Sequence, residues 1–186
     1  MHQPKIHLLL PLLGALVLLA PACADDPVAH SETVSLKLSG IKNGDLQNGV
    51  ASTSKNVNTE SGNPYAVFLK NAHDALGGKD PSIIEPVSVY VRVSADSKNV
   101  IAIEQVLGDL ELFAASSQTT IPIGHVTGPT GSSIRVPLDD TVDYEPLHDE
   151  MLSGDFKLGV RGNSVTPLPS DFELKLTLDV KFTAWP

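Results

Sequence analysis

The densest group of chemically capable residues in this 186-residue chain is acidic: six carboxylates fall within twelve positions. Ca²⁺ prefers roughly six to eight oxygen ligands, so this run is a candidate calcium site. Its spacing departs from the D-x-[DN]-x-[DN]-G pattern of a calcium loop, and no glycine provides the sharp turn. The simpler interpretation is a solvated acidic turn followed by a short helix, whose first turn favours carboxylates. The candidate ligands are Asp139, Asp140, Asp143 and Glu145, followed by Asp149 and Glu150.

Aromatic residues make up only 5% of the chain, so few side chains could form a flat platform for a sugar ring. Tyr90 is the main candidate, because in the run VSVYVRVSA it shares the polar positions with Ser88 and Arg92. Tyr144 and Trp185 are the other aromatic residues outside the apolar pattern. We expect the phenylalanines to lie in the core, because they mostly follow the apolar positions. Carbohydrate binding through Tyr90 is therefore one function to weigh.

Neither the histidines nor any linear motif indicates a particular reaction. His125 follows a short apolar strand and His148 lies among the carboxylates, so they would form a metal site only if their loops met. The chain has no G-x-S-x-G, H-E-x-x-H or C-x-x-C motif and no glycine-rich phosphate loop. We therefore expect a protein without enzymatic activity or cofactor. A hydrolase whose catalytic residues are assembled in space is the alternative.

Alternation of apolar and polar residues predicts most of the elements that would carry these side chains. In the clearest strand, 172–182, six apolar residues alternate with polar ones, as in a sheet with one buried and one solvated face. Other strands are expected over 34–38, 87–93, 110–116, 119–126, 134–138 and 156–160. In the second of these, the residues expected to face the core together are Val87, Val89, Val91 and Val93.

One convincing helix is expected over 64–76, because Asn63 can cap it and Pro64 suits its first turn. A second, short helix is expected over 146–152. Residues 42–63 contain few apolar side chains and predict a long loop, with at most a weak strand near Val50.

Many short strands with one main helix indicate a mainly β protein. We expect an antiparallel β-sandwich of about seven or eight strands, formed by a single domain over 33–186. Residues 100–107 fit either a strand or a short helical turn.

The N-terminus has the layout of an export signal over 1–22. Lys5 precedes twelve apolar residues, 8–19, and small residues follow. Twelve residues make a helix of about 18 Å, whereas a bilayer core of roughly 30 Å requires about 20 residues. A cleaved signal peptide is therefore favoured over a permanent transmembrane helix.

The chain's single cysteine closes this segment, and Ala20-Pro21-Ala22-Cys23 resembles the lipobox of bacterial lipoproteins. The resemblance implies that Cys23 is lipidated and begins the mature chain, with a tether over 23–32. In the sorting rule of enteric bacteria, Asp beside the lipidated cysteine retains the protein at the inner membrane, so Ala24 favours the outer membrane. The alternative is an ordinary A-x-A cleavage site, in which case the cysteine would leave with the signal peptide.

Charge narrows the range of partners. Removal of residues 1–22 takes away one of 13 cations and none of the 22 carboxylates, so the mature chain carries a formal charge of −10. Such a charge argues against nucleic acid as a partner. The leading hypothesis is an exported, lipid-anchored, non-enzymatic protein that binds a protein or polymer partner in the bacterial envelope. A calcium-dependent or carbohydrate-binding module is the alternative.

Overall fold

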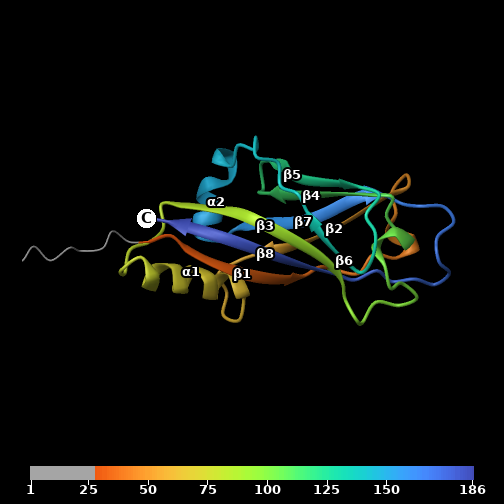
Figure 1. Ribbon diagram of the computed structural model, residues 1–186, viewed down its shortest axis with the longest axis horizontal. Coiled ribbons are helices and arrows are strands. Elements are labelled where there is room, and N and C mark those ends of the chain that lie inside the picture. The colour runs from red at the N-terminus through yellow and green to blue at the C-terminus, as the bar shows by residue number, and fades with distance from the viewer. Residues whose placement is uncertain (1–27) are drawn as a thin grey trace, which may run out of the picture.

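Eight strands form two four-stranded antiparallel sheets that pack face to face in a computed structural model, which describes residues 28–186 (Figure 1). The expected signal peptide and Cys23 lie outside the described residues. The first sheet has the order β1 (His30–Lys37), β8 (Leu176–Trp185), β3 (Ile83–Val93) and β6 (Ser133–Val136). The second has the order β2 (Val50–Val57), β7 (Phe156–Asn163), β4 (Asp109–Ala115) and β5 (Thr120–Thr127).

The strand pairing is that of one long antiparallel hairpin rolled up on itself. β1 pairs with β8, β2 with β7, β3 with β6 and β4 with β5, and the β3–β8 and β4–β7 pairs complete the sheets. This is the topology of a jelly roll. The predicted antiparallel β-sandwich of seven or eight strands is confirmed.

The core lies between the sheets, where inward side chains of both meet in one cluster. Along β8, the alternate residues Leu178, Val180 and Phe182 are fully buried. Aromatic rings close one end of this core: the Tyr65 ring centroid lies 5.2 Å from those of Phe156 and Phe182. Edge-to-face rings at this spacing stabilise beyond the area that they bury.

Two helices cover the end of the sandwich where β1 begins and β8 ends. α1 (Pro64–Ala75) starts as predicted: the side chain of Asn63 accepts a hydrogen bond from the Tyr65 N–H. α2 (His148–Ser153) continues from a 3-10 turn over Glu145–Leu147. The buried Tyr65 hydroxyl donates to the Met151 carbonyl at 2.7 Å, which ties the two helices together, and burial raises the pKa of this tyrosine.

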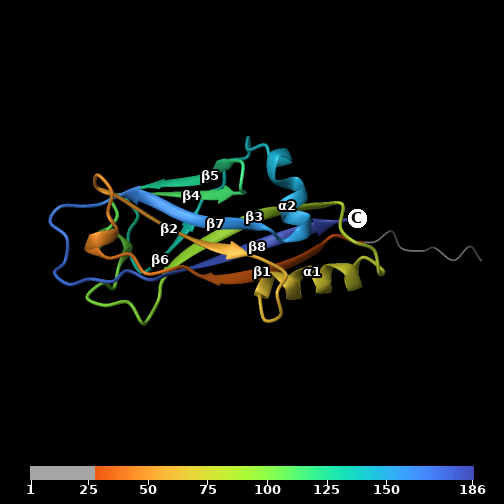
Figure 2. The same ribbon diagram turned by 180° about the vertical axis from the view of Figure 1, so that it is seen from behind.

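The sandwich therefore has two different ends (Figures 1 and 2). The helix end carries α1, α2, the start of β1 and the C-terminus, since His30 pairs with Ala184. The loop end carries the β1–β2, β3–β4, β5–β6 and β7–β8 connections. The ambiguous stretch 100–107 lies in the β3–β4 connection and contains a 3-10 turn, Ile103–Gln105. Within residues 28–186, no helix combines the length and apolar character needed to cross a membrane.

Two sequence expectations are wrong. The expected loop 42–63, with at most a weak strand near Val50, contains the whole eight-residue strand β2, whose buried positions are Ala51, Thr53 and Val57. Its sequence shows little apolar alternation, because Ala51 is small and Thr53 is polar. Val87 does not face the core with Val89: the β3–β8 register shifts between Pro86 and Ser88, and Val87 is 42% exposed. A bulge adds an unpaired residue to one strand, so the alternation restarts after it.

Candidate functional site

Two of the predicted calcium ligands accept hydrogen bonds from residues of the turns in which they lie. Asp139 accepts hydrogen bonds from the Thr141 hydroxyl at 2.6 Å and from the Thr141 backbone N–H at 2.9 Å, and these bonds, the hydroxyl's first, lower the pKa of Asp139. Asp143 accepts from the Glu145 N–H at 3.0 Å. Across residues 28–186, no three His, Cys, Asp or Glu side chains gather closely enough to hold a metal ion. The structure therefore does not bring Asp139, Asp140, Asp143 and Glu145 together into such a group.

The two candidate histidines lie apart. His125 sits on β5 opposite Glu111, on the outer face of the second sheet. At the helix end, His148 places Nε2 2.8 Å from the Ser82 carbonyl oxygen and Nδ1 3.2 Å from Asp149. The Ser82 carbonyl, followed by the Asp149 carboxylate, raises the pKa of His148.

A pocket of about 330 Å³ beside His148 brings together two of the predicted acids, Asp143 and Glu145, with Glu85 and Tyr144. Burial first, and then the negative charges of Glu85 and Asp139, raises the pKa of Tyr144 to about 12. This tyrosine therefore stays protonated near neutral pH. The rest of the lining consists of His148, three carboxylates and the apolar residues Ile83, Ile84 and Val142.

The predicted ligand-binding residue Tyr90 is 46% exposed, on the outer face of the first sheet. Strand register places it in a row of outward side chains that crosses all four strands: Ser35, Asp179, Tyr90 and Arg135. The row toward the loop end is Lys37, Thr177, Arg92 and Ser133, and the row toward the helix end is Thr33, Lys181 and Ser88. We call these three rows the Tyr90 face.

The Tyr90 face carries four cations and one carboxylate. The carboxylate, Asp179, pairs with Arg92 Nε and accepts a hydrogen bond of 2.6 Å from the Ser35 hydroxyl. Arg92, followed by Ser35, lowers the pKa of Asp179. Among the described residues, Lys37, Arg135 and Lys181 form no ion pair.

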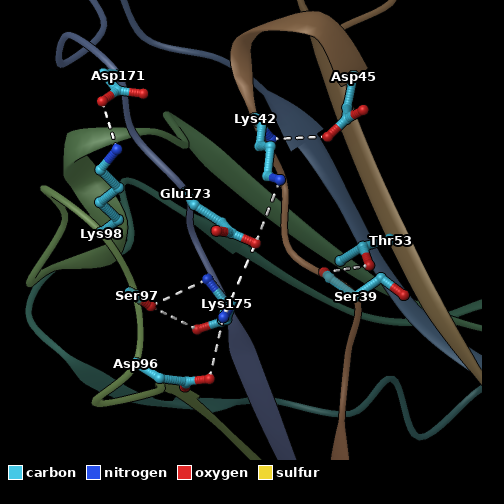
Figure 3. A network of polar contacts seen from close by, with 10 residues as sticks. All are labelled: Ser39, Lys42, Asp45, Thr53, Asp96, Ser97, Lys98, Asp171, Glu173 and Lys175. Atoms are coloured by element: carbon cyan, nitrogen blue, oxygen red, sulfur yellow. Dashed lines mark hydrogen bonds and ion pairs between the residues drawn. The ribbon is translucent and has the colours of Figure 1, made fainter.

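At the loop end, polar contacts join three connections into one network (Figure 3). Lys175 Nζ lies 3.2 Å from Asp96 and 3.9 Å from Glu173, and Lys42 Nζ lies 3.7 Å from Glu173. The Ser97 hydroxyl also bonds both backbone groups of Lys175, at 3.0 and 3.1 Å. Single exposed ion pairs contribute only about 0–1 kcal/mol, but together these contacts join the β1–β2, β3–β4 and β7–β8 loops.

The sequence analysis missed a second organised surface, on the outer face of the second sheet. Phe113 is half-buried there, against the expectation that the phenylalanines belong to the core. Arg161 lies over its ring, with Cζ 5.8 Å from the centroid, and forms an ion pair of 2.5 Å with Glu111. The sequence could have indicated this position, because Phe113 is two residues from Glu111 and therefore points to the same side of the strand, away from Leu112. We call Glu111, Phe113, Gly159 and Arg161 the Phe113 face.

No model of a protein family matches the chain, and no curated protein matches it. Among solved structures, a chain of turnip yellow mosaic virus aligns with 86% of this chain and 94% of its own, at 10% identity and a TM-score of 0.33. A chain from a full particle of Israeli acute paralysis virus heated to 63 degrees aligns with 100% of this chain and 79% of its own, at 14% identity and a TM-score of 0.24. At such scores, neither similarity carries an argument about function.

Proposed function

We propose that this protein is an exported lipoprotein, anchored through Cys23 to the bacterial outer membrane, whose β-sandwich binds a protein or polymer partner in the envelope. The non-enzymatic role is proposed because the sequence lacks the motifs of common catalytic sites. The acidic formal charge suits a domain that is held beside a membrane by its anchor rather than by attraction to anionic lipid.

The observation that carries this proposal is the separation of the two ends of the sandwich. β1 begins at the helix end, beside the end of β8, and the four loop connections lie at the opposite end. Seven residues lead from Cys23 to His30, and covalent geometry limits such a span to about 25 Å. An anchor at Cys23 would hold the helix end near the membrane and direct the loop end away from it.

The contacts between the loops support a binding role over a merely mobile surface. Lys175 and Glu173 form ion pairs with side chains of two other loops, so the loop end would be held in one arrangement before a partner binds. A preorganised surface loses less conformational entropy on binding.

The anchor is tested by expressing the chain and its Cys23→Ser variant in a bacterium supplied with a radiolabelled fatty acid. We expect the original chain to take up the label and to sediment with outer membranes, and the variant to lose both properties. The matched control is Ser31→Cys on the Cys23→Ser background, which restores a thiol eight residues further along and should restore neither. Intact mass decides against the proposal if the mature chain starts at Asp25 without lipid, as the A-x-A cleavage site requires.

A further inference from the structure

We propose that the Tyr90 face binds an anionic polysaccharide. This inference adds a binding surface on the outer face of the first sheet to the binding proposed for the loop end, and it does not depend on lipidation of Cys23. Three features carry it: three cations that form no ion pair within residues 28–186, the spacing of these cations, and the exposed tyrosine ring among hydroxyl groups.

The charge of the Tyr90 face is opposite to that of the molecule. The chain has a net charge of −9, yet this face has four cations and one carboxylate. Arg92 and Asp179 neutralise each other, which leaves Lys37, Arg135 and Lys181 without an ion pair, and Lys37, after Lys175, lowers the pKa of the nearby Asp96. At physiological salt, charges more than about 8 Å apart in solvent are largely screened. A ligand in contact with this face would therefore meet these three cations more strongly than the distant carboxylates.

The cations are spread out rather than convergent. Lys37 lies on one edge strand and Arg135 on the other, so three strand spacings of roughly 4.8 Å separate their backbones by about 14 Å. Lys181 lies two rows from Lys37, which at about 6.8 Å per row is also about 14 Å along the strands. With backbones this far apart, a single small anion is poorly placed to contact all three side chains. A polymer that repeats its negative charge can.

The residues between the cations suit a sugar chain. The Tyr90 ring lies in the central row beside Arg135, its direct neighbour on β6. Besides the buried Thr177, four hydroxyl side chains lie among the charged positions, and such groups can both donate and accept hydrogen bonds. An exposed aromatic ring offers an apolar face on which a sugar ring can stack. These hydroxyl residues are Thr33, Ser35, Ser88 and Ser133.

The same observations favour a polysaccharide over a lipid surface. Membrane-surface binding combines cations with apolar side chains that enter the headgroup region. The exposed apolar residues of β3, Ile83 and Val87, lie toward the helix end of the strand and outside the three rows.

The test measures binding of the full-length protein, in a neutral detergent, to immobilised polygalacturonate at low and physiological salt. We expect binding that weakens as salt rises, and none to dextran, which is neutral. Lys37→Gln, Arg135→Gln and Lys181→Gln combined should weaken binding at least tenfold, and Tyr90→Ala alone about fivefold. The charge-matched control combines Lys55→Gln, Lys79→Gln and Lys157→Gln, which lie off this face, and should change affinity less than twofold.

Four outcomes would overturn the proposal: no binding of the original chain at low salt, equal losses in the two triple variants, binding to phosphatidylglycerol vesicles without binding to polygalacturonate, or poly-L-glutamate bound as tightly as polygalacturonate. The last two would assign the face to a membrane or to an acidic protein. Unfolding midpoints of all variants should match the original chain, because every substituted side chain lies at the surface. A failure here leaves the lipid-labelling result untouched, so the two proposals fail separately.

Discussion

The two outer sheet faces use the same residue types in opposite ways. On the Phe113 face, the cation Arg161 is satisfied by Glu111 and by the aromatic ring beneath it. On the Tyr90 face, Arg135 lies next to an aromatic residue, yet forms no ion pair within the described chain. The comparison suggests a division between a face whose interactions serve the fold and a face whose interactions are left for a ligand.

The largest expected effect comes from the close packing of the Phe113 face. A Cβ at Gly159 would lie 2.5 Å from a Phe113 ring carbon and 2.6 Å from the Thr53 carbonyl oxygen. The backbone of Thr53 cannot move aside without disturbing β2. We expect Gly159→Ala to destabilise the protein in urea unfolding by about 2–3 kcal/mol, the upper part of the roughly 1–3 kcal/mol range for overpacked interiors.

The matched control is Gly44→Ala, where no atom lies within 4 Å of the added Cβ. It should change the free energy of unfolding by less than about 0.5 kcal/mol. Equal effects of the two substitutions would show that the ring does not rest on Gly159, and the description of this face would need revision.

A medium effect is expected from the same substitution made at one arginine of each face. Arg161→Gln removes the ion pair with Glu111 and the contact with Phe113, and should cost about 1 kcal/mol of stability. Arg135→Gln on the Tyr90 face should cost less than about 0.5 kcal/mol. The two variants are compared by urea unfolding at neutral pH. The division between the faces is wrong if Arg135→Gln is the more destabilising of the two.

Alternation in the sequence predicted the sandwich, because most of its strands have one buried and one solvated face. It also placed Tyr90 and Arg92 together on the outer face. It could not find Arg135 and Lys181 as their neighbours, since that depends on the β3–β6 and β3–β8 registers, which join residues about 45 and 90 positions apart.

Elsewhere, local pattern was misleading for identifiable reasons. The run from Asp139 to Glu150 looked like a ligand set because its carboxylates are close in sequence, but Asp139 and Asp143 bond to their own turns. Val87 looked like a core residue because the bulge that displaces it leaves no mark in an unbroken alternation. Phe113 is the opposite case. Its place in the alternation put it on the outer face with Glu111, but its apolar side chain led us to expect it in the core.

The smallest expected effect concerns the one carboxylate of the Tyr90 face. Because Arg92 and Ser35 lower the pKa of Asp179, its ionised form stabilises the fold at pH values above the unfolded pKa, near 4. That contribution is lost as the pH falls below 4 toward the folded pKa. Asp179→Asn should therefore flatten the pH dependence of stability between about pH 5 and 2, by roughly 0.5 kcal/mol, the scale of an exposed pair.

Urea unfolding at a series of pH values measures this slope. Arg92→Gln should flatten it in the same way, and the double variant should add nothing further, because both substitutions remove one interaction. If the two effects added instead, Asp179 would be neutralised by another cation of this face. Fewer than three cations of the Tyr90 face would then be left for a ligand. The Tyr90 face would resemble the Phe113 face, whose cation is already paired within the protein.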